Sequence, residues 1–150
     1  MKTIQVSKGD IQLKSGQLQF VVGTEKLAQD IALWLQEPLG TGYTSPGFGS
    51  TLLSMVGGNQ SNNNIAGIQN EIVRVLQLYQ GQQIINLQNA QNSAQLSYWN
   101  KNEIIKSINS VSINLQNSSV LANVSLTTLA NNTINLNVLI NNNGVSVNNG

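Results

Sequence analysis

The alternation of apolar and polar residues predicts short β-strands at the start of the chain. Gly9-Asp10 and Ser15-Gly16 are typical turn formers, and each lies between two short runs in which every second residue is apolar. The apolar positions of these runs are Ile4, Val6, Ile11, Leu13, Leu18, Phe20 and Val22. We therefore expect residues 1–22 to form N-terminal strands, as a hairpin or an extended arm.

Helical periodicity follows in residues 24–106, interrupted by one loop at 38–60. In the first helix Thr24 is placed to cap the start and Pro38 ends it. Its apolar stripe consists of Leu27, Ile31, Trp34 and Leu35. The loop is rich in turn formers but also carries apolar residues such as Phe48, so we expect it to be ordered.

A second and longer helical pattern begins after a possible cap at Asn63 or Asn64. Its apolar stripe consists of Ile65, Ile68, Ile72, Val75, Leu76 and Tyr79. The stripe can be continued through Ile84, Leu87, Ala90, Ala94 and Tyr98 if it drifts around the helix. The pattern predicts one long or kinked helix that reaches about residue 100.

From residue 107 to 140 the period returns to two, which predicts three strands joined by turns at Asn117-Ser118-Ser119 and Asn131-Asn132. We expect the tail at 141–150 to be frayed or to require a partner. The fold class is thus α+β in a single domain, residues 1–150. Two main helices pack on a small antiparallel sheet, with strand-forming N- and C-terminal arms.

Composition favours assembly with other proteins. Charged residues make up 9% of the 150 positions, against about 25% in an average domain, whereas Asn and Gln fill about a quarter. An amide-rich surface is solvated without strong charge repulsion, so other proteins can approach it closely. An AT-rich genome is an alternative cause of the Asn content. The net charge of +1, with its basic residues spread along the chain, argues against nucleic acid as a partner.

The residue types present limit the possible chemistry. Without Cys or His the chain has no thiolate or imidazole for a zinc site or for a Cys-His or Ser-His nucleophile. A Ser-Lys pair stays possible, but no spacing selects one. We expect no cofactor, no metal site and no catalytic residue. No apolar run approaches the length of a membrane span, and the N-terminus does not resemble a signal peptide. We therefore expect the protein to be made and kept in the cytosol unless a larger particle carries it out, and we expect no membrane partner.

One segment resembles a known family. Gly23-Thr24-Glu25-Lys26-Leu27-Ala28-Gln29-Asp30-Ile31, followed by a glycine-containing loop with Ser45-Pro46-Gly47-Phe48-Gly49-Ser50-Thr51-Leu52, resembles the baseplate wedge and sheath-initiator family of contractile-tail bacteriophages. Lys101-Asn102-Glu103 stands where that family has Glu-Pro-Arg. The resemblance implies two helices on a small sheet, with terminal strands that complete sheets in neighbouring subunits. It also implies a structural role in the tail baseplate of a virion, in several symmetric copies. The partners it implies are other tail or baseplate proteins, including sheath and tube or hub subunits.

That family is sometimes called lysozyme-like, which suggests an alternative function as a tail-associated peptidoglycan hydrolase. Glycoside hydrolysis usually needs two carboxylates at a defined separation. The candidates are Glu25, Asp30 and Glu37, but Glu25 is better explained by the helix dipole and Glu37 precedes the proline that stops the helix. A free-standing binding module is the third possibility. We expect the chain not to be an enzyme.

The strands at both ends predict where neighbours bind. The apolar runs at residues 4–6 and 134–140 contain none of the lysines and prolines that protect exposed sheet edges, so they favour strand addition. Removal of residues 1–8 or 141–150 is expected to leave a folded monomer that cannot assemble. Phe48 either fills its own core or docks into a neighbour, and Tyr98-Trp99 are further contact candidates. The predicted interface residues are Ile4, Val6, Phe48, Tyr98, Trp99, Ile134, Leu136 and Val138.

Overall fold

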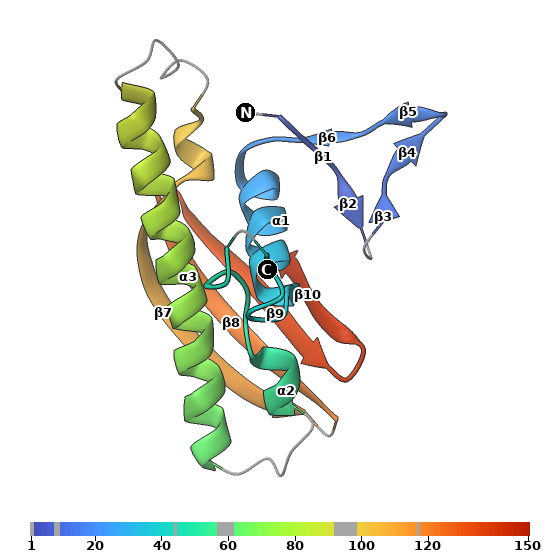
Figure 1. Ribbon diagram of the computed structural model, residues 1–150, viewed down its shortest axis with the longest axis vertical. Helices are drawn as coiled ribbons and strands as arrows, with labels where there is room; N and C mark the ends of the chain where they lie inside the picture. Colours follow the sequence, from blue (N-terminus) through green and yellow to red (C-terminus); the bar gives the residue numbers. More distant parts are fainter. Residues whose placement is uncertain (1, 8–9, 44, 57–61, 92–98, 117) are drawn as a thin grey trace.

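The chain folds as a four-stranded antiparallel sheet covered on one face by helices, with a separate arm at its N-terminus (Figure 1). The computed structural model describes residues 2–7, 10–43, 45–56, 62–91, 99–116 and 118–150. The body consists of α1 (Gly23–Gln36), α2 (Leu52–Val56), α3 (Asn62–Gln91), the 3-10 turn η2 (Lys101–Glu103), β7 (Ile105–Gln116), β8 (Ser119–Thr128), β9 (Thr133–Asn141) and β10 (Gly144–Asn149). The predicted α+β class is confirmed.

The sheet has the order β10-β9-β8-β7, and every neighbouring pair is antiparallel. The three strands predicted between residues 107 and 140 are present as β7, β8 and β9, although β7 begins already at Ile105 inside the segment expected to be helical. The expectation of a frayed tail is wrong. Residues 144–149 form β10, which pairs with β9 from Gly144↔Asn141 to Asn149↔Leu136.

Alternation in β8 divides the sheet into an apolar and a polar face. Its residues alternate between half-exposed and buried along the whole strand, and the buried ones face the helices. On the opposite face a row of small polar side chains crosses all four strands. It consists of Ser112, Asn123, Asn137 and Asn148. Part of the high Asn content therefore lies on this solvent-facing side of the sheet.

Helix α1 buries the predicted stripe. Leu27, Ile31 and Leu35 are almost completely buried, and Trp34 packs against the same core. The helix ends before Pro38, as expected. Its start differs, because Thr24 lies inside the helix and the N-cap residue Val22 makes no side-chain cap. The backbone N–H of Gly23 instead donates to Oε1 of Glu103 at 2.9 Å, 80 residues away.

Helix α3 runs for 30 residues along β7 (Figure 1). Ile68, Ile72, Val75 and Leu76 are buried as predicted. The predicted continuation of the stripe holds only in part, since 44% of Ile84 is exposed and Leu87 is half-buried, whereas Ala90 is buried. The helix ends at Gln91, whereas the sequence predicts an end near residue 100; residues 92–98 lie outside the described residues.

The N-terminal arm consists of six two-residue strands paired into three short antiparallel ladders. The strands are β1 (Thr3–Ile4), β2 (Val6–Ser7), β3 (Asp10–Ile11), β4 (Leu13–Lys14), β5 (Gln17–Leu18) and β6 (Phe20–Val21). The predicted turn at Ser15-Gly16 is present, with both residues at positive φ. Figure 1 shows that β3, β4 and β5 project from the body in a triangular outline.

Candidate protein–protein interfaces

The outer edge of β10 is the first candidate interface. The N–H of Gly150 donates to the carbonyl of its partner Asn135 on β9 at 2.8 Å. Because hydrogen bonding alternates along an antiparallel pair, the backbone groups of Val145, Val147 and Asn149 are directed away from β9. The side chain of Gln36 on α1 donates to the carbonyl of Val145, in agreement with this direction.

A groove of about 600 Å³ lies along this edge. One wall is β10 from Val145 to Asn149, and the other includes Val6 of the arm. Ala28 and Ala32 of α1 also line it, and their small side chains leave room beside the strand. The groove thus places an edge strand beside a mixed lining of polar and small apolar side chains. The edge supplies backbone groups for an added β-strand, and the apolar members of the lining can contact its side chains.

The predicted interface on β9 is wrong. Leu136 and Val138 are fully buried in the core, and β9 is paired on both sides, with β8 and with β10. Ile134 lies near the start of the strand, partly buried against the same core. The prediction failed because residues 144–149 form a further strand and therefore take the edge position that was assigned to β9.

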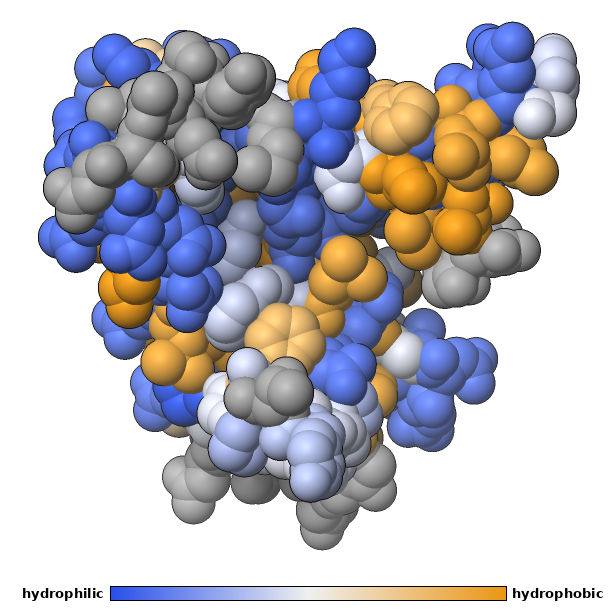
Figure 2. All heavy atoms as spheres, turned by 45° about the horizontal axis from the view of Figure 1, so that its top comes forward, coloured by the Kyte–Doolittle hydropathy of each residue, from blue (hydrophilic) through white to orange (hydrophobic). Residues whose placement is uncertain are grey.

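The arm presents a second candidate surface. Ile4 and Val6 are half-buried, but the apolar residues of the later strands are largely exposed. Ile11, Leu13, Leu18, Phe20 and Val22 have exposed fractions of 51%, 62%, 45%, 55% and 48%. Figure 2 shows the apolar side chains gathered over the arm. Sequence alternation identified these positions as strand residues but could not show that their apolar side chains remain uncovered.

Phe48 belongs to an internal aromatic cluster. Its ring lies 4.5 Å from that of Trp34 in an edge-to-face arrangement, and Trp34 lies 5.3 Å from Tyr79. Of the two roles predicted for Phe48, the structure supports packing within its own core. Tyr43 in the same loop is fully exposed and was missed as a contact candidate, because no periodicity marks a loop residue.

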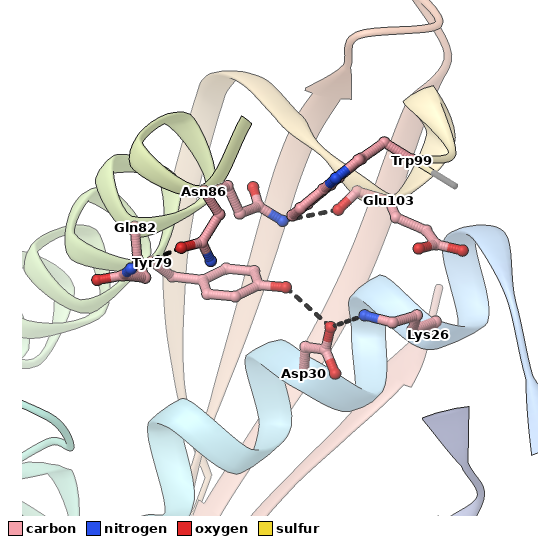
Figure 3. A pocket seen from close by; sticks show the side chains of 8 residues that line it. Lys26, Asp30, Tyr79, Gln82, Asn86, Trp99 and Glu103 are labelled. Carbon is pink, nitrogen blue, oxygen red and sulfur yellow. Dashed lines mark hydrogen bonds and ion pairs between the residues drawn. The ribbon is translucent and has the colours of Figure 1, made fainter. Parts of the chain in front are cut away.

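A pocket of about 210 Å³ lies where α1, α3 and η2 meet (Figure 3). The predicted contact residue Trp99 lines it and is half-buried; Tyr98 lies outside the described residues. The hydroxyl of Tyr79 donates to Oδ2 of Asp30 at 2.9 Å, and Lys26 contacts the same oxygen. Burial and the nearby Asp30 charge raise the pKa of the Tyr79 phenol, which therefore stays a hydrogen-bond donor at neutral pH.

The carboxylates proposed for hydrolysis do not gather at this pocket. Asp30 lines it together with Glu103, which sequence reasoning did not single out, whereas Glu25 lines the β10 groove. Glu37 accepts a hydrogen bond from the Thr41 hydroxyl at 2.6 Å. Because Glu103 holds the start of α1 and Asp30 is bound by Lys26 and Tyr79, their contacts join α1 to α3 and η2.

The loop in the family-like segment is held by an ion pair on α3. Oε1 of Glu71 accepts the N–H of Thr51 at 2.8 Å, and Arg74 donates to the carbonyl of Gly49 at 3.0 Å and to Glu71 at 2.7 Å. Gly49 has a φ of 103°, and a Cβ there would lie 2.5 Å from the carbonyl oxygen of Glu37. Glycine is thus required at position 49 of the Phe-Gly sequence, because the backbone there passes close to that of Glu37. These contacts hold the loop in place.

Comparison with known proteins finds no matching family model, no matching curated protein and no matching solved structure. In the part of the chain that the structure describes, no helix is long and apolar enough to cross a membrane. The same residues contain no group of three or more acidic side chains placed to hold a metal ion.

Proposed function

We propose that this chain is a structural subunit of a phage-type tail baseplate, a wedge component or sheath initiator, and not an enzyme. It acts in the virion, in multiple copies, through contacts with other tail and baseplate proteins. The observation that carries the proposal is the outer edge of β10, whose outward backbone groups lie beside a groove lined by polar and small apolar side chains. A neighbouring strand placed there extends the four-stranded sheet by one member.

The resemblance of residues 23–52 to the wedge and sheath-initiator family supplies the type of assembly. The resembling segment contains helix α1, which lines the groove, and the loop that Glu71 and Arg74 hold in place. Helix α1 packs against β10 and the loop is bonded to α3, so a strand bound at β10 has a defined position relative to both parts. This is the property expected of a subunit that passes a defined orientation to its neighbours.

Val147→Pro tests strand addition at β10. Proline removes the outward N–H of residue 147 and is tolerated on an outer edge, because that N–H makes no bond to β9. Val147→Ala is the matched control, since it shortens the same side chain but keeps the N–H. With each variant introduced into the source genome, we expect Val147→Pro to lower the number of complete tails in electron micrographs at least tenfold, and Val147→Ala to leave it nearly unchanged.

Circular dichroism of the purified variants establishes that both are folded. Normal assembly by a folded Val147→Pro variant would contradict strand addition at this edge. Turnover of peptidoglycan by the purified protein, lost when Glu25, Asp30 and Glu37 are each changed to glutamine, would instead favour the lysozyme-like alternative.

A further inference from the structure

The N-terminal arm is an internal repeat of seven residues. Its three units begin with Ile4-Gln5-Val6, Ile11-Gln12-Leu13 and Leu18-Gln19-Phe20, and glycine stands three positions after each unit, at residues 9, 16 and 23. In each unit a glutamine is flanked by two apolar residues. The same order of apolar residue, glutamine, apolar residue and later glycine therefore recurs every seven positions.

The three units close into a ring. Val6 pairs with Ile11, Leu13 with Leu18, and Phe20 with Ile4, so the last unit returns to the first. The central glutamines are joined through their backbones. The N–H of Gln5 donates to the carbonyl of Gln19 at 2.8 Å, that of Gln12 to Gln5 at 2.9 Å, and that of Gln19 to Gln12 at 3.1 Å. The arm thus has three sides that are equivalent in register. We call Ile4-Gln5-Val6 the first side, Ile11-Gln12-Leu13 the second and Leu18-Gln19-Phe20 the third.

The first side is already occupied by the chain's own helix. On α1, Nε2 of Gln29 donates to the carbonyl of Ile4 at 2.9 Å, and Oε1 of Gln29 accepts the N–H of Val6 at 2.8 Å. A single amide side chain therefore satisfies both backbone groups, as a neighbouring strand would. The small residues Ala28 and Ala32 lie on the same helix and line the groove beside Val6.

The third side has the same backbone register but a different environment. By the threefold equivalence, the carbonyl of Leu18 and the N–H of Phe20 take the places that Ile4 and Val6 hold on the first side. Leu18 and Phe20 are 45% and 55% exposed, and Val22 extends this apolar surface towards α1. Aromatic residues, including phenylalanine, are enriched at the cores of protein–protein interfaces.

We propose that the Leu18-Gln19-Phe20 side of the arm binds a helix of a partner subunit. The partner helix presents a glutamine with small apolar residues one position before it and three positions after it, as Ala28 and Ala32 accompany Gln29 on α1. Its amide bonds to the Leu18 carbonyl and the Phe20 N–H, and its small residues allow Leu18 and Phe20 to pack against the helix. This surface is separate from the β10 groove, so the proposal can fail while strand addition stands.

A helical peptide derived from α1 tests the proposal. The probe is residues 23–37 with the core-facing Leu27, Ile31 and Leu35 changed to alanine, and its matched control also carries Gln29→Ala. Each is added at millimolar concentration to the isotope-labelled full chain, and backbone amide shifts are followed by NMR. We expect the probe to shift the amides of residues 18–20 and the control peptide to lose at least four fifths of that shift.

Two chain variants locate the contact. Phe20→Ser is expected to abolish the shifts, whereas Leu13→Ser, on the neighbouring side of the ring, leaves them unchanged; unaltered signals from the body establish that each variant is folded. Three results would overturn the proposal: no shift at residues 18–20, equal shifts with both peptides, or shifts confined to Ile4 and Val6. The last means that the probe replaces the chain's own helix. Dimerisation of the chain through this side would also overturn it, by making a second copy the occupant.

Discussion

Glu71 stabilises the loop after α1 through its charge. Hydrogen bonding to Arg74 lowers the pKa of the Glu71 carboxyl to about 2, against the usual 4.5, and the N–H of Thr51 contributes in the same direction. Only 8% of Glu71 is exposed. A carboxyl whose pKa is lower in the folded than in the unfolded chain has its ionised form stabilised by folding, so this group stabilises the protein at neutral pH, where the carboxyl is ionised in both states.

The stability should therefore fall in acid within a defined window. The contribution of Glu71, on the order of 2–3 kcal/mol, is complete above about pH 4.5 and is lost progressively as the pH falls towards 2. Glu71→Gln should be less stable at pH 7 by a similar amount and should show a flatter decline below pH 4.5. Urea unfolding at pH 7, 4 and 3 measures both. Equal pH dependence in the two proteins would contradict the assignment.

Glutamine residues explain much of what hydropathy could not predict at this scale. Gln29 and Gln83 each bond to two backbone groups of another segment, in the manner of a one-residue strand. A pattern of apolar positions assigns such residues to the surface, because the hydrogen bonds that bury them are made with a segment far away in sequence. The same limit applies to Thr24: a local cap was predicted, but Glu103 supplies the acceptor from 80 residues away.

At the scale of elements, α3 covers the edge strand β7 with amide side chains. Gln69 donates to the carbonyl of Val111 at 2.9 Å, and Gln80 to that of Lys106 at 2.9 Å. Gln83 donates to the carbonyl of Glu103 at 2.7 Å and accepts the N–H of Ile105 at 3.0 Å, where β7 begins. This edge of the sheet is protected by a helix and its glutamines, and not by the lysines or prolines sought in the strand itself.

Among the glutamines of α3 that bond to β7, Gln83 should lower the stability of the protein most when it is replaced. It is 5% exposed, so Gln83→Leu leaves the Glu103 carbonyl and the Ile105 N–H buried without their partner. We expect a loss of about 2–4 kcal/mol in the free energy of unfolding. Gln82→Leu, on the exposed neighbour, is the matched control and should change it by less than about 0.5 kcal/mol. Denaturant unfolding compares them, and similar losses in both would contradict a specific role for Gln83.

The elements that sequence could predict are those whose periodicity is long enough to be unambiguous. The stripe of α1, the buried half of α3 and the alternation in β8 each span several turns or several residue pairs. β10 was missed because only Val145 and Val147 alternate there, among Asn, Ser and Gly residues that are typical of turns. Its strand conformation depends on pairing with β9, a contact that no local pattern contains.

For the whole molecule, the two ends of the chain differ in what they contribute. The main core draws its buried residues from the helices and the sheet, and no described residue of 1–22 belongs to that cluster, although Val21, next to α1, is itself only 6% exposed. β10, in contrast, contributes Val145, which is 4% exposed, and it pairs with β9 beside Val138 and Ile140. The arm is thus an attachment to the body, whereas the C-terminal strand is part of it.

Removal of each end should separate these roles. The sequence predicts a folded monomer that cannot assemble after either end is trimmed, whereas the structure predicts different costs for the two ends. Deletion of residues 1–20 should change the free energy of unfolding by less than about 1 kcal/mol, because the arm meets α1 chiefly through Gln29, which water can then solvate. Deletion of 141–150 should cost more than about 3 kcal/mol or prevent folding, since it uncovers Val138 and Ile140 and loses the burial of Val145. Thermal and urea unfolding measure both deletions. If the first deletion unfolded the body, the arm would have to belong to the core; if the second were neutral, β10 would be an accessory strand and its edge a poor anchor for a neighbour.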